Sequence, residues 1–370
     1  MFIHFHEGKS NDDLPHFSPN IFGVALVGVE LLSIFAAKKQ TDMTERPAYI
    51  TNFGESYCGD SLVLIDQLDN NSVDLVVTSP PFALLRQKEY GNETQADYVE
   101  WLGQFAKKVY PKLKDTGSLV VDLGGAYQRG KPIRSLYNFR VLLYFCDTLG
   151  YHLAEEFYWF NPSKLPSPIE WVNKRKIRAK DSVNTVWWFS KSDNPKADVR
   201  KVLTPYSDRM KKLIQDPSKF YTPKKRPSGH DISASFGTDN GGAIPSNLLQ
   251  ISNSESNGRY LALCKKFGIK AHPARFPHKL PEFFIKMLTD EGDLVVDIFG
   301  GSCTTGEVCE NLQRRWKCFE LDREYLAASV FRFASKDMTD ESVKAMYDNI
   351  CNNSPIYEIV TKKEKTLFDM

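Results

Sequence analysis

Uninterrupted apolar runs alternate along this chain with segments whose apolar residues recur every three or four positions. The runs at 74–78, 117–125 and 293–299 are typical of parallel strands buried on both faces. Further strands are predicted at 57–58, 152–160 and 316–321. Helical spacing predicts helices at 97–110, 137–149, 281–288, 307–315 and 323–335. Strands and helices in alternation predict an α/β sheet with helices on its faces.

The pattern also predicts how the chain is organised. Residues 43–160 and 271–340 carry the regular elements, and we expect them to form two halves of one core. Residues 161–270 lose periodicity and are rich in Pro, Gly, Ser, Asn and Lys, which indicates an inserted region with a binding task. We expect the polar residues 341–370 to form a peripheral tail.

The first 42 residues are predicted to be an N-terminal extension outside the core. They contain a 17-residue apolar run, 21–37, which is short for a membrane span and is interrupted by Glu30. A surface helix, or an upstream extension with Met43 as a second start, is the favoured interpretation, and a membrane segment is the alternative. We therefore expect no membrane association.

Charge is distributed unevenly although the formal net charge is only +2. Residues 160–230 contain 17 Lys and Arg against 6 Asp and Glu. A basic sector on an otherwise acidic body indicates a polyanion partner, and a solvated charged surface is the alternative. The seven cysteines include no C-x-x-C pair, which predicts neither a disulfide framework nor a metal site and fits free thiols in the cytoplasm.

The pentapeptide Thr78–Phe82 (Thr-Ser-Pro-Pro-Phe) directly follows the first buried run. Ligands collect at the carboxyl edge of an open α/β sheet, where this loop is predicted to lie. The loop offers the Ser79 hydroxyl, carbonyl acceptors on two prolines and the ring of Phe82. Such groups can accept hydrogen bonds from an amino group while an aromatic ring stacks on a planar base.

A second motif, 297–306 (Asp-Ile-Phe-Gly-Gly-Ser-Cys-Thr-Thr-Gly), follows the run at 293–299. Strand, glycine-rich loop, helix and a second strand ending in an acid form the geometry that holds an adenosine-containing cofactor. Glu320 lies 20 residues after Gly300, the spacing expected for an acid on the ribose hydroxyls. A nicotinamide cofactor is the rival, but the loop lacks the G-x-G-x-x-G spacing, and Asp297 suits an ammonium group better than a pyrophosphate.

Together the two motifs resemble those of the DNA amino-methyltransferases, in whose β subgroup the catalytic loop precedes the cofactor loop. Segments 161–178, 252–258 and 272–277 further resemble the PvuII type of modification methyltransferase, and the resemblance covers residues 47–335. It implies a doubly wound, mostly parallel sheet in permuted order with an inserted target-recognition region. It implies S-adenosyl-L-methionine as methyl donor and N4 of a flipped cytosine in double-stranded DNA as acceptor. It further suggests CAGCTG or a related palindrome as the site and a restriction endonuclease as functional partner. We also expect a monomer, because a modification enzyme that acts on hemimethylated sites needs only one subunit.

The resemblance assigns roles to individual residues. Ser79 and the Pro80 carbonyl would hold the amino group and Phe82 would stack on the base, so the predicted catalytic residues are Ser79, Pro80, Pro81 and Phe82. Residues 273–276 would close the methionine pocket, and Asp60 would bind the adenine amino group. The predicted cofactor-binding residues are Asp60, Pro273, Ala274, Arg275, Phe276, Asp297, Phe299, Gly300, Gly301, Ser302, Thr305 and Glu320.

Basic residues between aromatic ones suit a surface that follows phosphates and stacks on bases. The candidate DNA-binding residues are Lys174, Arg175, Arg178, Lys224, Lys225, Arg226 and His230. Trp187 and Trp188 are instead expected in the core, because they lie in an apolar strand-like run.

Two other functions remain open. An adenine-N6 methyltransferase would share the fold and cofactor, but its loop usually begins with Asp or Asn, whereas this loop begins with Ser79. A non-catalytic DNA-binding protein on the same fold is the second alternative, which the intact loop and acids disfavour.

Overall fold

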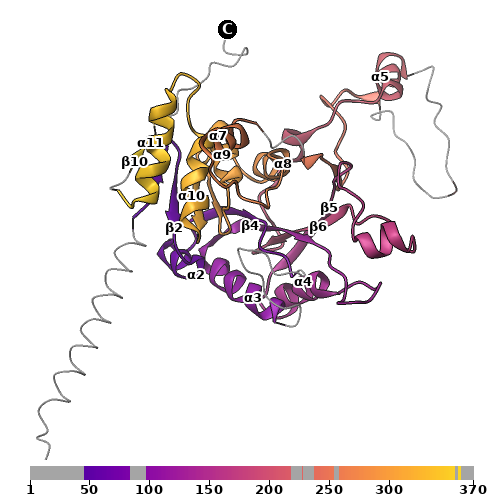
Figure 1. Cartoon of the computed structure of the whole chain (residues 1–370). Helices are drawn as coiled ribbons and strands as arrows, with labels where there is room; N and C mark the ends of the chain where they lie inside the picture. Colours follow the sequence, from indigo (N-terminus) through magenta and orange to yellow (C-terminus); the bar gives the residue numbers. More distant parts are fainter. Residues whose placement is uncertain are drawn as a thin grey trace, which may run out of the picture. The chain divides into compact units, whose positions relative to one another are not determined.

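The computed structural model describes residues 46–83, 97–217, 227, 237–253, 258–354 and 357–359 of the 370-residue chain. In this part, ten strands form one sheet in the order β10-β1-β2-β9-β8-β3-β4-β6-β5-β7 (Figure 1). The five central strands β2, β9, β8, β3 and β4 are parallel to one another, whereas β1 is antiparallel to β2 and β6 is antiparallel to both β4 and β5. The predicted mostly parallel, doubly wound α/β sheet is confirmed.

The strands have the following bounds: β1 Tyr49–Ile50, β2 Gly54–Cys58, β3 Val73–Thr78, β4 Leu113–Gly124, β5 His152–Phe160, β6 Val183–Ser190, β7 Leu248–Gln250, β8 Leu294–Asp297, β9 Arg315–Glu320 and β10 Tyr357–Glu358. The order places β3 beside β8, although they lie more than 200 residues apart in the sequence. The two predicted motifs, which follow β3 and β8, therefore leave the sheet side by side.

The helices have these bounds: α2 Ser61–Leu64, α3 Tyr98–Val109, α4 Tyr137–Asp147, α5 Asp208–Gln215, α7 Arg259–Phe267, α8 Lys279–Leu288, α9 Thr304–Asn311, α10 Arg323–Ser329 and α11 Asp340–Cys351. Short helical turns lie at Ile65–Gln67, Tyr110–Lys112, Glu170–Lys174, Val199–Val202 and Val330–Arg332. Helices α2 to α4 cover one face of the sheet, and α7 to α11 cover the other (Figure 1).

Alternate residues of each central strand enter different cores, because successive side chains point to opposite faces. On β6, Trp188 joins the core under α7 to α11, whereas Trp187 joins the core under α2 to α4. Both tryptophans are buried, as expected. Burial on both faces explains why these strands appear in the sequence as continuous apolar runs.

The irregular region contains more structure than the sequence predicts. Helix α5 begins at the cap Ser207, whose hydroxyl accepts from the Met210 amide, and β7 adds a strand beside β5. Helix α7 begins at Arg259, so regular structure resumes before His272, where we expected it. The pattern failed here because α5 buries no side chain and β7 has three residues.

The expectation of a peripheral tail is wrong for its first part. Helix α11 buries Val343, Met346 and Ile350 in the core. These residues recur at helical spacing, so one face of α11 belongs to the packed body. Strand β10 then pairs with β1 at the edge of the sheet.

The predicted extension, residues 1–42, and its apolar run lie outside the described residues. Of the helices that the structure describes, none is both long and apolar enough to cross a membrane.

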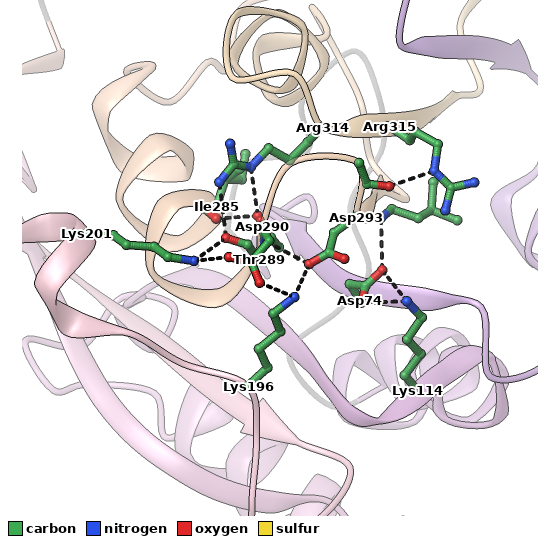
Figure 2. A network of polar contacts seen from close by, with 12 residues as sticks. Asp74, Lys114, Lys196, Lys201, Ile285, Thr289, Asp290, Asp293, Arg314 and Arg315 are labelled. Carbon is green, nitrogen blue, oxygen red and sulfur yellow. Dashed lines mark hydrogen bonds and ion pairs between the residues drawn. The ribbon is translucent and has the colours of Figure 1, made fainter.

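At the end of the sheet where the parallel strands begin, called the amino edge below, charged side chains connect neighbouring strands (Figure 2). Lys114, near the start of β4, donates to both carboxylate oxygens of Asp74 on β3, each at 2.8 Å. Asp74 also accepts from the Leu294 amide of β8 at 3.0 Å. The network thus connects the strands that carry the two motifs at the end opposite to the motifs.

The same edge anchors the part of the irregular region that follows β6. Lys196 bonds Asp293 at 2.5 Å and pairs with Asp290 at 2.7 Å, and Lys201 donates to Asp290 and to the Thr289 carbonyl (Figure 2). The segment after β6 is therefore held to the turn before β8.

Candidate active site

The ends of β3 and β8 are joined through one buried carboxylate. Asp297, the last residue of β8, accepts from the Thr78 hydroxyl at 2.7 Å, the Thr305 hydroxyl at 2.6 Å and the Phe299 amide at 3.1 Å. Burial raises the pKa of Asp297, and these hydrogen bonds offset part of the effect. Asp297 therefore fixes the catalytic loop and the glycine-rich loop in register.

Ser79 is hydrogen-bonded to an acid that the sequence analysis did not nominate. Its hydroxyl donates to Asp122 Oδ2 at 3.0 Å, and the Asn184 amide group donates to Asp122 Oδ1 at 3.0 Å. Burial raises the pKa of Asp122 to about 6, and the bonds from Asn184 and Ser79 and the charge of Lys164 partly offset it. A signal was present in the sequence, since Asp122 is an acid inside an apolar run.

The other residues of the predicted catalytic loop lie around this pair. Pro80 is buried, and Pro81 and Phe82 are half-buried. A Cβ on Gly124 would lie 2.4 Å from the Phe82 ring and 3.3 Å from Asn184 Oδ1. The absence of a side chain at Gly124 thus lets the ring lie over the end of β4, close to the residues that bind Asp122.

The glycine-rich loop turns tightly at the end of β8. The Gly300 amide donates to the Phe319 carbonyl at 2.8 Å, and a Cβ at this position would lie 3.1 Å from that oxygen. Gly301 adopts a φ of 52°, which favours glycine. Glycine at both positions therefore lets the loop pack against β9 and the His272 ring with no side chain in between.

Glu320, the last residue of β9, faces this loop. One carboxylate oxygen accepts from the Gly301 amide at 2.7 Å and the other from the Asp322 amide at 2.8 Å. Burial raises the pKa of Glu320 to about 7, which these bonds partly offset. Each oxygen retains acceptor capacity for a further donor, such as a hydroxyl.

Asp60 lies at the neighbouring strand end. The Gly59 amide donates to the Glu320 carbonyl at 3.0 Å, so the turn after β2 lies beside the end of β9. Asp60 is exposed, and its Oδ1 caps α2 by accepting from the Leu62 amide at 2.9 Å. One carboxylate oxygen of Asp60 thus caps the helix, and the second oxygen is not needed for this cap.

The predicted pocket-closing segment lies against the glycine-rich loop. A Cβ on Gly301 would lie 3.2 Å from the His272 ring, and His272 Nδ1 is 2.6 Å from the Ala274 carbonyl. Arg275 donates to the His272 carbonyl, and Phe276 packs against the core. Residues 273 and 274 are exposed, so part of the segment is open to solvent next to the loop.

Two of the nominated residues support the loop from inside. Ser302 is buried, and Arg332 donates to its carbonyl at 2.5 Å and to its hydroxyl at 2.8 Å. Thr305 is buried with its hydroxyl on Asp297. The positions of Ser302 and Thr305 suit a supporting role better than direct contact with a ligand.

Comparison with known proteins places this geometry in a family. Residues 73–331 match the model of the N6/N4 DNA methylases, described as DNA methylase. The chain is 62% identical to the type II methyltransferase M.PvuII of Proteus hauseri, over 88% of this chain and 97% of the relative. The chain belongs to the N6/N4 DNA methylase family.

Other members are more distant. The type II methyltransferase M.HpaI of Haemophilus parainfluenzae is 25% identical, over 78% of this chain and 77% of the relative. The solved structure of the PvuII DNA methyltransferase, which is named cytosine-N4-specific, matches with a TM-score of 0.70 and 55% identity. That match covers 84% of this chain and 97% of the other, so the fold is shared over most of this methylase.

The basic residues nominated for DNA contact in this methylase fall into two groups. Lys174 and Arg175 both pair with Glu170, and the Arg175 guanidinium lies 4.9 Å from the centre of the Trp171 ring. Arg178 donates to the Pro132 carbonyl at 2.9 Å. Lys224, Lys225, Arg226 and His230 lie outside the described residues.

Proposed function

We propose that the protein is a site-specific, type II modification methyltransferase that transfers a methyl group from S-adenosyl-L-methionine to N4 of a cytosine in duplex DNA. The observation that carries the proposal is the hydrogen bond from Ser79 to the buried Asp122. Ser79 directly follows β3, which lies beside β8 and therefore beside the glycine-rich loop. The similarity to M.PvuII supports cytosine N4 as the acceptor.

The residues of the glycine-rich loop fit this cofactor. Gly300 and Gly301 keep the backbone of the loop free of side chains, and the half-buried carboxylate of Glu320 can accept from ribose hydroxyls. Asp60 would contact the adenine amino group, and residues 273–276 would enclose the methionine part. When bound, the cofactor supplies an electrophilic methyl group on a positively charged sulfur.

The target cytosine must leave the duplex, because its amino group is engaged in base pairing. Unstacking costs a few kcal/mol, and stacking on the Phe82 ring would offset part of this cost. Phe82 is half-buried beside Gly124, next to Asn184 and the Ser79–Asp122 pair. A base on this ring would present its amino group to the catalytic loop.

The cytosine amino group is a weak nucleophile because its lone pair is delocalised into the ring. The Ser79 hydroxyl donates a hydrogen bond to Asp122, so the lone pairs of the Ser79 oxygen are available to accept a hydrogen bond from the amino group. The Pro80 carbonyl would accept the second amino hydrogen. Two acceptors would draw the hydrogens out of the ring plane and favour a nitrogen that can attack the methyl group.

Asp122 would stabilise the positive charge that develops on the nitrogen. Its carboxylate is buried and reaches the amino group through Ser79, so its influence is weakly screened by solvent. The proton lost by the nitrogen would pass to Ser79 as the Ser79 proton passes to Asp122. This role suits an acid whose pKa is raised to about 6.

The similarity further supports CAGCTG or a related palindrome as the methylated site, and protection against an endonuclease of the same specificity as the biological role. Action as a monomer is consistent with this role, because one subunit suffices to methylate a hemimethylated site. The test is to incubate the protein with unmodified plasmid DNA and labelled S-adenosyl-L-methionine, and to identify the methylated nucleoside by mass. N4-methylcytosine is expected. N6-methyladenine would contradict the assignment based on Ser79, and a protein that binds cofactor without methylating DNA would contradict the proposed activity.

A further inference from the structure

A short hairpin connects the active-site end of β4 with α4. The Ser135 amide donates to the Ala126 carbonyl at 2.8 Å, and the Gln128 amide donates to the Ile133 carbonyl at 2.9 Å. Its turn contains Gly130 with a φ of 69°, which favours glycine. Residues 126–135 are called the β4–α4 hairpin below, and they begin four residues after Asp122.

The β4–α4 hairpin is held at its base. Arg134 pairs with Asp181 at 2.7 Å, and its guanidinium lies 4.9 Å from the centre of the Tyr127 ring. Arg178 donates to the Pro132 carbonyl at 2.9 Å. Arg178 and Asp181 belong to the segment after β5, so the hairpin and the start of the recognition region form one connected surface.

The hairpin also borders the proposed cytosine pocket. Gly124, against which Phe82 packs, and Gly125, against which Arg134 packs, are adjacent in the sequence. The chain therefore passes from the contact with the Phe82 ring to the contact with the hairpin within two residues. The base of the hairpin therefore adjoins the proposed pocket, and the tip lies four to six residues farther along the chain.

Two cations lie at the tip of the hairpin. Arg129 and Lys131 are exposed, and within the described ranges neither forms an ion pair. Two acids of this connected surface are already engaged, since Asp181 pairs with Arg134 and Glu170 pairs with Arg175. Exposed cations of this kind bind phosphates, which contribute affinity without reading sequence.

We propose that the β4–α4 hairpin is a second DNA-contacting element, in which Arg129 and Lys131 bind backbone phosphates beside the target nucleotide. The proposal rests on the proposed function, because it requires duplex DNA as substrate. The recognition region would read the site, whereas the hairpin would hold the sugar-phosphate backbone near the flipped base. A fixed hairpin suits this task, since it orders little on binding.

The test compares two double variants that each remove two positive charges. Arg129→Gln/Lys131→Gln changes the hairpin tip. Lys107→Gln/Arg315→Gln is the matched control, because Lys107 lies on the last turn of α3 and Arg315 begins β9 at the opposite edge of the sheet, both outside the recognition region. Binding to a duplex that contains CAGCTG and to a scrambled duplex is measured at several salt concentrations, with S-adenosyl-L-methionine binding measured in parallel.

We expect the hairpin variant to bind both duplexes at least about tenfold more weakly at low salt, with the slope of log K against log salt reduced by about two. The control should keep the parental slope, and both variants should bind cofactor like the parent. An unchanged slope in the hairpin variant, or a loss confined to the CAGCTG duplex, would overturn the proposal. If the parent neither binds nor methylates DNA, the proposed function fails first, which distinguishes the two failures.

Discussion

The acids at the carboxyl edge and at the amino edge of the central sheet are bound by different groups, and the pKa shifts found among them have opposite directions at the two edges. At the carboxyl edge, Asp122, Asp297 and Glu320 accept hydrogen bonds from hydroxyl, amide and peptide groups, and burial raises the pKa of each. At the amino edge, Asp290 is bonded to Lys196 and Lys201, which lower its pKa to about 2 (Figure 2). The same side-chain type therefore has different properties at the two ends of the same strands.

The difference indicates a division of tasks. Lysines at the amino edge neutralise the acids there. Lys114 connects β4 to β3, and Lys196 and Lys201 hold the segment after β6 to the turn before β8. At the carboxyl edge, neutral donors orient the acids but leave their charge available. A cationic cofactor and a nitrogen that becomes positive during transfer are ligands that such an edge can stabilise.

The largest effect should come from Asp122→Asn. The exchange keeps the size of the side chain but removes the charge that acts on the amino group through Ser79. We expect the single-turnover rate of methyl transfer to fall by at least about 100-fold, with cofactor affinity within about twofold of the parent. The measurement is quenched-flow transfer of labelled methyl groups together with equilibrium cofactor binding.

Asp290→Asn is the matched control, since it makes the same chemical change at the other edge. Its transfer rate should stay within about twofold of the parent. Adding Ser79→Ala to Asp122→Asn should cost less than the product of the two single effects, because both residues act on one amino group. Equal rate losses at Asp290 and Asp122 would break the proposed division between the edges.

A smaller effect is expected for Glu320→Ala. The side chain orients the glycine-rich loop through the Gly301 amide and offers acceptors for ribose hydroxyls. We expect cofactor affinity to fall by about 10- to 100-fold, which corresponds to about 1.4 to 2.8 kcal/mol. Isothermal titration calorimetry measures the cofactor affinity of the parent and the variant. An affinity equal to that of the parent would exclude Glu320 from the cofactor site.

The edges should also differ in the sign of their pH dependence. Glu320 has its pKa raised from 4.5 to about 7, so between these values the unfolded state ionises first and the free energy of unfolding falls as pH rises. Asp290 has its pKa lowered from 3.8 to about 2, so its contribution is present above pH 3.8 and is lost as pH falls toward 2.

The check is urea unfolding of the cofactor-free parent and Glu320→Gln between pH 5 and 8. The stability of the parent relative to the variant should decrease by about 2 kcal/mol across this range and then level off. A constant difference would show that Glu320 does not titrate there. Cofactor affinity of the parent should increase over the same range, because an ionised Glu320 accepts more hydrogen bonds.

The sequence predicts the carboxyl edge better than the amino edge. Apolar runs followed by the Pro-Pro and Gly-Gly sequences locate both loops, and the adjacency of β3 and β8 confirms that they meet. Local composition carries this information, because a buried strand and a tight loop each have a strong signature. The ion pairs of Lys196 and Lys201 carry no such signature, since exposed lysines occur throughout the chain.

The Ser79–Asp122 bond shows where the sequence fell short within the site itself. The register pairs Thr78 with Val121, which brings Ser79 opposite Asp122 across 43 residues. No local pattern gives the register of two parallel strands, so the partner of Ser79 required the structure. Helix α11 is a different case, because the helical spacing of Val343, Met346 and Ile350 was visible and the polar composition around it obscured it.

The smallest effect is expected at the amino edge, from Lys196→Met. The side chain pairs with Asp290 and Asp293 but is about one third exposed, so water screens the interaction. We expect the free energy of unfolding to fall by less than about 1 kcal/mol at low salt, with a smaller difference at 1 M salt. Cofactor affinity should be unchanged, because the residue lies at the far end of the strands. Lys196 lies within the irregular region proposed to read DNA, and it holds that region to the turn before β8. A rise in KM for DNA with an unchanged transfer rate would therefore sharpen the comparison, because the amino edge would then position this region while the carboxyl edge performs the chemistry.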